Sequence, residues 1–243
     1  MTGAQAMILA AGRGERMRPL TDNCPKPLLE VRGKPLIQYH LEALVRSGFS
    51  ELVVNTAWMG HLIENRFAPG GTSQSCGVDP ELQHLHIRYS HEGRDFGGAL
   101  ETAGGIARAL PLLDDAFWLV GGDVYVPQFE FSRAAMDRFA VGSDLAHIVL
   151  VPNPQHNPKG DFGLRADGVA LSRTDTQYTY STIGLYRKAL FASLPAGNPQ
   201  GIKAPLAPLL RAAMDNGRVT AEIYTGPWTD VGTPARLAQL NAT

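Results

Sequence analysis

This sequence is poor in cysteine and carries no marked excess of either charge. Its 243 residues include only two cysteines, Cys24 and Cys76, which is too few for a disulfide framework or a thiolate metal site. The formal net charge at pH 7 is -1, so the composition gives no sign of the basic surface that nucleic-acid binding needs. These shortages exclude small disulfide-rich proteins and argue against a nucleic-acid partner.

Long apolar runs are also missing. The apolar stretch at residues 6–11 is too short to cross a bilayer and lacks the basic flank of a secretory signal, and no later stretch is long enough either. No internal repeat or low-complexity segment occurs. We therefore expect a cytoplasmic protein that contacts no membrane, and the sequence carries no signature of its oligomeric state.

Strand-like and helix-like apolar patterns alternate along the chain. With 44% hydrophobic and 19% charged residues, the composition suits one large α/β domain. We expect strands at residues 5–10, 51–55, 85–90, 117–120, 145–151, 162–164, 169–171, 180–186 and 219–224. We expect helices at residues 36–45, 59–67, 102–110 and 205–214, and a loop at residues 69–80. The alternation predicts a Rossmann-like mixed, mainly parallel sheet with helices on both faces.

Glycines and cations cluster where the first expected strand ends. Gly12 and Gly14 can adopt φ > 0 and carry no Cβ, so backbone N–H groups there can approach phosphate oxygens. Arg13 and Arg16 add positive charge. Two prolines flank Lys26 and restrict the backbone around it, so this lysine loses little entropy on meeting an anion. The segment therefore predicts a loop that binds a triphosphate.

Other interpretations of the same segment fit less well. A dinucleotide-binding fingerprint needs a third glycine where Met17 stands, and a P-loop needs a Gly-Lys-Ser/Thr triplet that does not follow. A nicotinamide-dependent oxidoreductase would also leave the Pro-Lys-Pro segment unexplained. An alternative remains in which the segment is only a tight turn whose arginines face solvent.

The run from Gly12 to Leu28 closely resembles the signature of sugar-phosphate nucleotidyltransferases, which combines Gly-x-Gly, an arginine, Pro-Leu-Thr and then Pro-Lys-Pro. Two later segments, at residues 122–124 and 228–233, fall in the order that such enzymes show. The segment at residues 99–105 is most similar to the N-acetylmuramate-1-phosphate uridylyltransferase branch, because guanylyl-transferring relatives usually carry glycine where Glu101 stands.

This resemblance implies a Mg²⁺-dependent enzyme of the nucleotide-diphospho-sugar transferase fold. It would transfer a nucleotidyl group from an NTP, with UTP favoured, to a sugar 1-phosphate, with N-acetylmuramate 1-phosphate favoured. The products would be an NDP-sugar and pyrophosphate, in peptidoglycan recycling for the cell wall. Guanylyl transfer to mannose or heptose 1-phosphate is the alternative within the family. A nicotinamide-dependent oxidoreductase and a non-catalytic nucleotide-binding regulator are the alternatives from other classes.

The resemblance also implies a set of site residues, and charge explains why the chemistry needs them. Two strongly anionic reactants must meet in line, so cations must offset their repulsion. The expected catalytic residues are Lys26 and Arg16, and the expected metal ligands, suited to a hard ion such as Mg²⁺, are Asp123 and Asp230. The expected nucleotide-binding residues are Leu9, Ala10, Ala11, Gly12, Arg13, Gly14, Glu92 and Glu101. The expected substrate-binding residues are Asp161, Lys203 and Thr102.

Base choice stays open at this stage. A carboxylate at Glu92 would accept the N–H of uracil, but it would equally accept the N–H groups of guanine.

We expect a single domain, with a nucleotide-binding half at residues 1–124, a sugar-phosphate-binding half at residues 125–243, and no C-terminal β-helix. Three features depart from the uridylyltransferase branch. The loop at residues 93–100 is longer, Gly121 stands where asparagine is usual, and residues 181–184 read Ser-Thr-Ile-Gly in place of Ser-Gly-Ile. These departures fall on the base and acceptor sides of the expected site.

Overall fold

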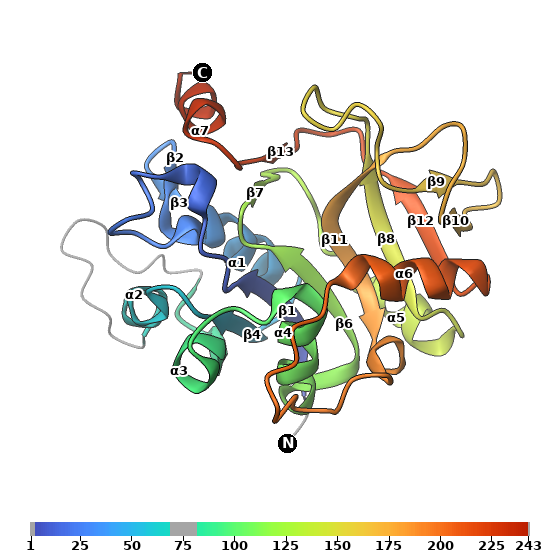
Figure 1. Cartoon of the computed structure of the whole chain (residues 1–243), viewed down its shortest axis with the longest axis horizontal. Coiled ribbons are helices and arrows are strands. Elements are labelled where there is room, and N and C mark those ends of the chain that lie inside the picture. The colour runs from blue at the N-terminus through green and yellow to red at the C-terminus, as the bar shows by residue number, and fades with distance from the viewer. Residues whose placement is uncertain (1–2, 69–81, 243) are drawn as a thin grey trace.

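A mixed seven-stranded sheet forms the centre of the molecule in the computed structural model, which describes residues 3–68 and 82–242 (Figure 1). The expected loop at residues 69–80, including Cys76, lies outside the described residues. The strand order is β12-β8-β11-β6-β1-β4-β5. Of these seven strands, β11 alone runs antiparallel to its neighbours, and every other pair is parallel. The strand bounds are β1 Ala4–Ala10, β4 Glu51–Thr56, β5 His86–His91, β6 Leu113–Gly121, β8 Ala146–Val151, β11 Thr179–Arg187 and β12 Val219–Ile223.

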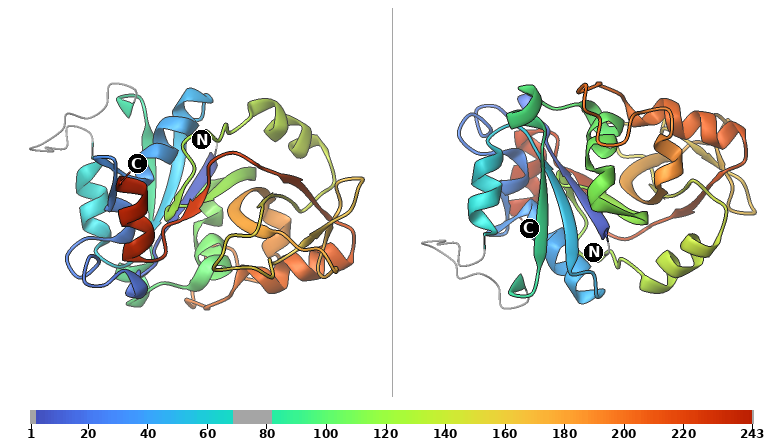
Figure 2. Two further views of the ribbon diagram at one scale, coloured as in Figure 1. Left: turned by 90° about the horizontal axis from the view of Figure 1, so that it is seen from above. Right: turned by 90° about the horizontal axis from the view of Figure 1, so that it is seen from below.

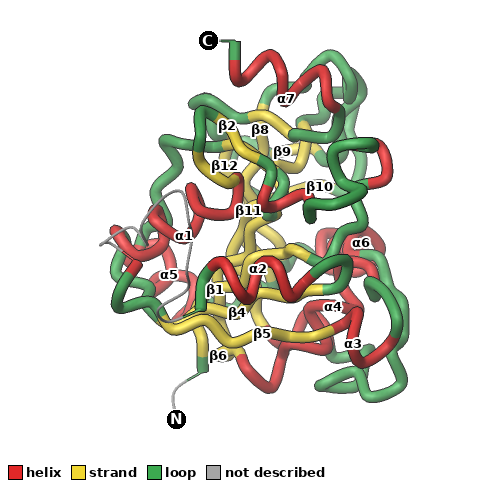
Figure 3. The backbone as a smooth tube through the Cα atoms, turned by 90° about the vertical axis from the view of Figure 1, so that its left-hand side faces the viewer, coloured by secondary structure: helices red, strands yellow, loops and turns green. Residues whose placement is uncertain are grey.

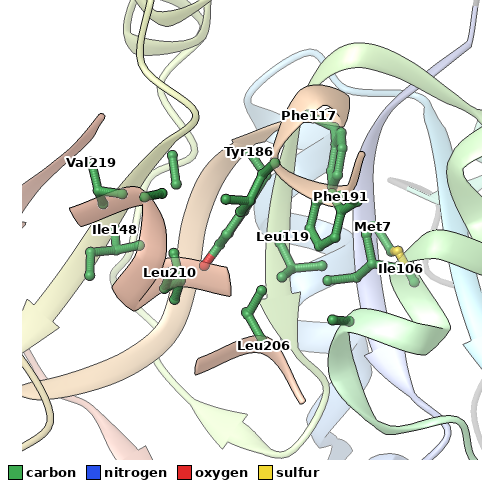
Figure 4. Close-up of a cluster of buried hydrophobic side chains, with 14 of the residues drawn as sticks. Met7, Ile106, Phe117, Leu119, Ile148, Tyr186, Phe191, Leu206, Leu210 and Val219 are labelled. Atoms are coloured by element: carbon green, nitrogen blue, oxygen red, sulfur yellow. The ribbon is translucent and has the colours of Figure 1, made fainter. Parts of the chain in front are cut away.

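Helices cover both faces of this sheet (Figures 1 and 2). On one face α1 (Leu36–Arg46) and α5 (Arg133–Val141) pack against a cluster that includes Ile8 and Trp118. On the other face α4 (Glu101–Ala109) and α6 (Leu206–Asp215) pack against the cluster drawn in Figure 4, where Met7 and Leu119 meet Ile106, Leu206 and Leu210. Adjacent residues of one strand therefore enter different cores, which explains why these strands read as continuous apolar runs.

The expected fold class is confirmed, and most expected elements are present within a residue or two. The strand expected at residues 117–120 is longer, because β6 begins at Leu113. The expected strands at residues 162–164 and 169–171 form a separate hairpin, β9 (Gly163–Leu164) and β10 (Ala170–Leu171), outside the main sheet. None of the helices in the described ranges combines the length and apolar character needed to cross a lipid bilayer.

Among the described residues, three α-helices were not anticipated from the sequence: α3 (Glu92–Phe96), α5 and α7 (Pro234–Asn241). Helix α5 is capped by Ser132, whose side chain accepts a hydrogen bond from the Ala135 N–H. Helix α7 is capped in the same way by Thr233. Both caps are local signals of a helix start.

The C-terminal segment returns to the N-terminal half of the molecule, where α7 lies beside the short strand β2 (Glu30–Val31) (Figures 2 and 3). Leu237 joins a small buried cluster with Met17, Leu36 and Tyr125. The strand before α7, β13 (Thr229–Asp230), pairs with β7 (Val124–Tyr125). The last described elements therefore brace the region where the first strand ends.

Candidate active site

A pocket of about 260 Å³ opens at the carboxyl ends of β1, β4 and β6. Ligands of open α/β sheets gather at this edge, because the loops that follow parallel strands converge there. The residues that line it are Leu9, Ala10, Ala11, Gly12, Lys26, Pro27, Asn55, Glu92, Ala99, Glu101, Thr102, Gly121, Asp123 and Thr182.

An ion pair between Lys26 and Asp123 spans this pocket. Lys26 begins the short helix η2 (Lys26–Leu28), directly after Pro25. The lysine is only 7% exposed, and its Nζ donates to Asp123 Oδ2 at 2.6 Å. A buried ammonium that lacks a partner is energetically costly. Lys26 therefore keeps Asp123 as its partner here, and an anionic ligand could take the same position.

A buried histidine supports the segment that carries Asp123. His40 lies in α1, is 1% exposed, and its Nε2 lies 2.9 Å from the Val124 carbonyl oxygen. Burial lowers the pKa of His40 to about 4, so the ring is neutral at pH 7. The nitrogen that faces the carbonyl must then carry the proton and donate it. This bond fixes β7 against the core, one residue beyond Asp123.

The second expected metal ligand, Asp230, approaches the site through strand pairing. In the β7–β13 pair Asp230 lies opposite Val124, and the Val231 N–H donates to the Asp123 carbonyl oxygen at 3.0 Å. The carboxylate of Asp230 accepts a hydrogen bond from Arg236 at 3.0 Å. The structure therefore brings the two backbones together, while each carboxylate keeps its own basic partner and only Asp123 lines the pocket.

The glycine-rich loop is open on its ligand side. Gly14 has φ +66°, as the sequence analysis allows, whereas Gly12 does not adopt positive φ. A Cβ built at Gly12 would meet no atom within 4 Å. Arg16 is exposed in η1 (Glu15–Met17) and lies outside the set of residues that line the pocket.

Arg13 is held by an aromatic side chain. Its guanidinium carbon lies 3.6 Å from the ring centroid of Trp58. The Arg13 side chain donates to the Thr21 carbonyl oxygen at 2.9 Å, and Trp58 Nε1 donates to the same oxygen at 3.1 Å. Stacking of this kind restricts an otherwise mobile cation beside the glycine-rich loop.

Glu92 is fully buried, and both of its carboxylate oxygens are engaged within the protein. Oε1 accepts from Asn55 Nδ2 at 2.6 Å, and Oε2 accepts from the Leu100 N–H at 2.7 Å. Burial raises the pKa of this carboxyl. Asn55 Oδ1 in turn accepts from the Ala10 N–H at 2.8 Å. Glu92 therefore links the residue before α4, Leu100, to β1 through Asn55.

A second pocket of about 550 Å³ adjoins the first and shares Leu9, Glu101, Thr102 and Thr182 with it. Its remaining lining is more aromatic and apolar, and consists of Asp161, Phe162, Tyr180, Pro205, Leu206, Ala207, Leu210 and Arg211. The two pockets together form one continuous hollow on one side of the sheet, large enough for two ligands in contact.

Two charged groups in the second pocket are oriented by the protein itself. Asp161 Oδ2 accepts from Asn157 Nδ2 at 3.1 Å and from the Tyr180 N–H at 2.9 Å. Arg211 donates to the Asp161 carbonyl oxygen at 3.2 Å, and its guanidinium lies 4.9 Å from the Phe162 ring centroid.

The structure gathers most of the expected residues around this hollow. Those that line it are Leu9, Ala10, Ala11, Gly12, Lys26, Glu92, Glu101, Thr102, Asp123 and Asp161. Those outside the lining are Arg13, Gly14, Arg16, Lys203 and Asp230. Sequence reasoning missed Asn55, Trp58, Tyr180 and Arg211. Of these, only Asn55 had a visible signal, as a polar residue at the end of an otherwise apolar strand.

Comparison with known proteins gives a consistent result. A sequence model described as nucleotidyl transferase matches residues 5–168. The chain is 46% identical to the N-acetylmuramate alpha-1-phosphate uridylyltransferase of Neisseria meningitidis, over 98% of this chain and 97% of that protein. It is 31% identical to the protein of the same name from Caulobacter vibrioides, over 96% and 94% of the two chains.

A solved structure from Bacillus anthracis, assigned as a glucose-1-phosphate thymidylyltransferase and crystallised with sucrose, superposes with a TM-score of 0.74. The identity is 19%, over 98% of this chain and 94% of that one. This likeness confirms the fold.

Proposed function

This chain belongs to the nucleotidyl transferase family, and we propose that it transfers the uridylyl group of UTP to N-acetylmuramate 1-phosphate. The observation that carries the proposal is the pair of adjoining pockets, one with the buried Lys26 paired to Asp123 and the other with an oriented Asp161 and Arg211. Near full-length similarity to a uridylyltransferase supports the choice of substrates.

In this proposal the donor occupies the first pocket. The base lies against Leu9, Ala10 and Ala11, with Glu101 at its edge. The fully buried Glu92 supports this wall through Asn55, which accepts from the Ala10 N–H. The triphosphate follows the open side of the loop at residues 12–14, where Arg13 and Arg16 offset its charge. The acceptor occupies the second pocket, beside Thr102 and Asp161, and Lys203 lies two residues before Pro205 of that lining.

The reaction needs no covalent intermediate on the protein. An ionised oxygen of the acceptor phosphate attacks the α-phosphorus of UTP, the bond between the α-phosphorus and the bridging oxygen breaks, and pyrophosphate leaves with that oxygen. Because the nucleophile is already deprotonated, no general base is required. Lys26 lies in the donor pocket, where its ammonium offsets the negative charge that gathers around the α-phosphate in the transition state.

A divalent metal fits the carboxylates of this site. Asp123 lines the donor pocket and Asp230 lies on the strand paired beside it, and Mg²⁺ is typically held by one or two carboxylates together with phosphate oxygens and water. Within the described ranges no group of three or more His, Cys, Asp or Glu side chains is placed to hold a metal alone, so the substrate phosphates would complete the site. When bound, the ion would neutralise phosphate charge.

The proposal also assigns roles to the two halves of the chain. Residues 1–124 supply most of the donor pocket, and residues 125–243 supply most of the acceptor pocket. A nucleoside triphosphate donor favours the cytoplasm as the place of the reaction. An activated N-acetylmuramate as the product favours a role in peptidoglycan recycling.

Release of pyrophosphate tests this function. The purified protein is assayed with UTP, GTP or dTTP against N-acetylmuramate, mannose and glucose 1-phosphates, with Mg²⁺ and with EDTA. We expect UTP with N-acetylmuramate 1-phosphate to be turned over fastest, and only with the metal. Preference for GTP with mannose 1-phosphate would replace the proposal with guanylyl transfer. Nucleotide binding without turnover of any pair would indicate a regulator.

A further inference from the structure

Thr182 has a backbone conformation that is unfavourable for its residue type. Its φ is +63°, and a β-branched residue in the left-handed region is a steric outlier. The residue sits where the pairing of β11 with β8 shifts register, between Tyr180 and Ile183. A strained residue that persists in a well-ordered strand indicates that its side chain has a function that glycine could not supply.

The bulge that holds Thr182 is fixed by its neighbours. The Ser181 hydroxyl donates to the Val149 carbonyl oxygen at 2.7 Å and accepts from the Ile183 N–H at 3.1 Å. Trp228 Nε1 donates to the Ser181 carbonyl oxygen at 3.1 Å. These bonds satisfy the irregular backbone, so the side chain at position 182 is not needed to hold the bulge together.

The side chain of Thr182 lies at the boundary between the two pockets. Thr182 lines both the donor pocket and the acceptor pocket. It also fills the space beside Gly121, because a Cβ at Gly121 would lie 2.6 Å from Thr182 Oγ1 and 3.0 Å from Asp123 Oδ1. Two of the departures found in the sequence are therefore in contact: the glycine at position 121 makes room for the threonine at position 182.

The hydroxyl of Thr182 has a fixed polarity. Oγ1 donates its proton to the Ser181 carbonyl oxygen at 2.6 Å. A hydroxyl whose proton is committed can only accept a further hydrogen bond. It therefore suits an O–H or N–H donor and does not suit an ionised phosphate oxygen. Tyr180, on the same strand, lines the acceptor pocket and not the donor pocket, so we assign the hydroxyl of Thr182 to the sugar of the acceptor.

From these observations, and on the basis of the proposed function, we infer that Thr182 is a specificity-determining residue for the acceptor. Its Oγ1, which lies beside Gly121 at the boundary of the two pockets, accepts a hydrogen bond from a hydroxyl or amide N–H of the sugar 1-phosphate. UTP makes no hydrogen bond to it.

Steady-state kinetics of three variants test this inference. Thr182→Val keeps the branched shape without the acceptor oxygen, Thr182→Ser keeps the oxygen, and Thr182→Gly removes the side chain and the backbone strain. With UTP and N-acetylmuramate 1-phosphate we expect Val and Gly to raise the KM for the sugar phosphate about 10-fold, the value of one hydrogen bond. Ser stays within about threefold, and the KM for UTP is unchanged in all three. Thr220→Val, in β12 away from both pockets, is the matched control.

Melting temperature separates this role from a structural one. Thr182→Gly relieves the strain, so its melting temperature should equal or exceed that of the wild type while its acceptor KM rises. A fall in melting temperature with both KM values raised alike would overturn the inference, as would an unchanged acceptor KM in the Val and Gly variants.

The contact with Gly121 gives an independent test. Gly121→Ala alone should raise the acceptor KM. Adding Thr182→Gly should remove the closest clash of the new methyl group, which is with Thr182 Oγ1, so the two effects are not additive. Additive effects would contradict the contact. Turnover by the wild type tests the proposed function alone. The role of Thr182 is tested by the ratio of variant to wild-type KM, measured with whichever sugar 1-phosphate the wild type accepts.

Discussion

The donor and acceptor pockets meet at four shared residues, yet they are built in different ways. The donor pocket is formed by the ends of three parallel strands, with small residues, open backbone and one ion pair whose lysine is buried. The acceptor pocket is formed by the antiparallel strand β11, helix α6 and aromatic side chains. A surface of backbone and fixed charge suits a ligand that is always a nucleoside triphosphate. A surface of side chains can change with the sugar.

The largest effect should come from the buried cation of the donor pocket. Lys26→Ala removes the ammonium that we propose stabilises the reacting phosphates, so kcat should fall by at least ~10²-fold, the scale for one oriented stabilising group. Lys188→Ala, in η5 (Lys188–Phe191) outside both pockets, is the matched control. A kcat near the wild-type value in Lys26→Ala would show that Lys26 does not stabilise the transition state. The contrast between a charged donor pocket and an aromatic acceptor pocket would then have no catalytic meaning.

Asp123→Asn should change the metal requirement. An amide is a weaker ligand for Mg²⁺ than a carboxylate, so we expect the Mg²⁺ concentration for half-maximal activity to rise by roughly 10-fold or more. Asp230→Asn is the companion variant, and a smaller shift is expected because Asp230 lies outside the pocket lining. The result is read from activity against total Mg²⁺, and an unchanged curve for Asp123→Asn would remove this residue from the metal site.

Loss of the aromatic ring under Arg13 should weaken donor binding alone. Trp58→Ala removes the ring contact that restricts the Arg13 guanidinium but leaves its bond to the Thr21 carbonyl oxygen. A cation–π contact of ~1 kcal/mol corresponds to about a fivefold rise in the KM for UTP. The KM for the sugar phosphate should not change. Trp58→Phe keeps a ring and should recover most of the affinity. A rise in both KM values would show that Trp58 serves the whole site rather than the donor pocket.

The smallest expected effect lies in the acceptor pocket. Arg211→Lys removes the planar guanidinium that stacks on Phe162 and donates to the Asp161 carbonyl oxygen. Lysine does not reproduce that geometry, so we expect the KM for the sugar phosphate to rise about threefold while the KM for UTP and kcat stay near the wild type. A larger effect on UTP than on the sugar phosphate would reverse the assignment of the two pockets.

The donor side could be predicted from the sequence because its information is local. Gly12, Gly14 and Lys26 follow one strand within a short segment, and prolines beside Lys26 restrict the backbone. The apolar strands and the helix that begins at Leu36 were equally clear, since their patterns depend on near neighbours in the chain.

The acceptor side could not be predicted in the same way. Arg211 and Phe162 come together only through the packing of α6 against the hairpin region, and no spacing in the sequence announces that contact. The bulge at Thr182 depends on bonds to Val149 and Trp228, which are distant in the chain. The hydrogen bonds that Glu92 accepts from Asn55 and Leu100 could not be predicted either. A glutamate between two expected elements is normally assumed to be exposed to solvent.

The pairing of β13 with β7 has a consequence for synthesis of the protein. The segment that carries Asp123 reaches its final environment only when β13, more than a hundred residues later, has paired with β7. The Arg32 N–H likewise donates to the Asn241 side chain, far along the chain. During translation, therefore, the nascent chain can assemble its first parallel strands early but cannot pair β7 until β13 has been synthesised. Such long-range closure slows folding.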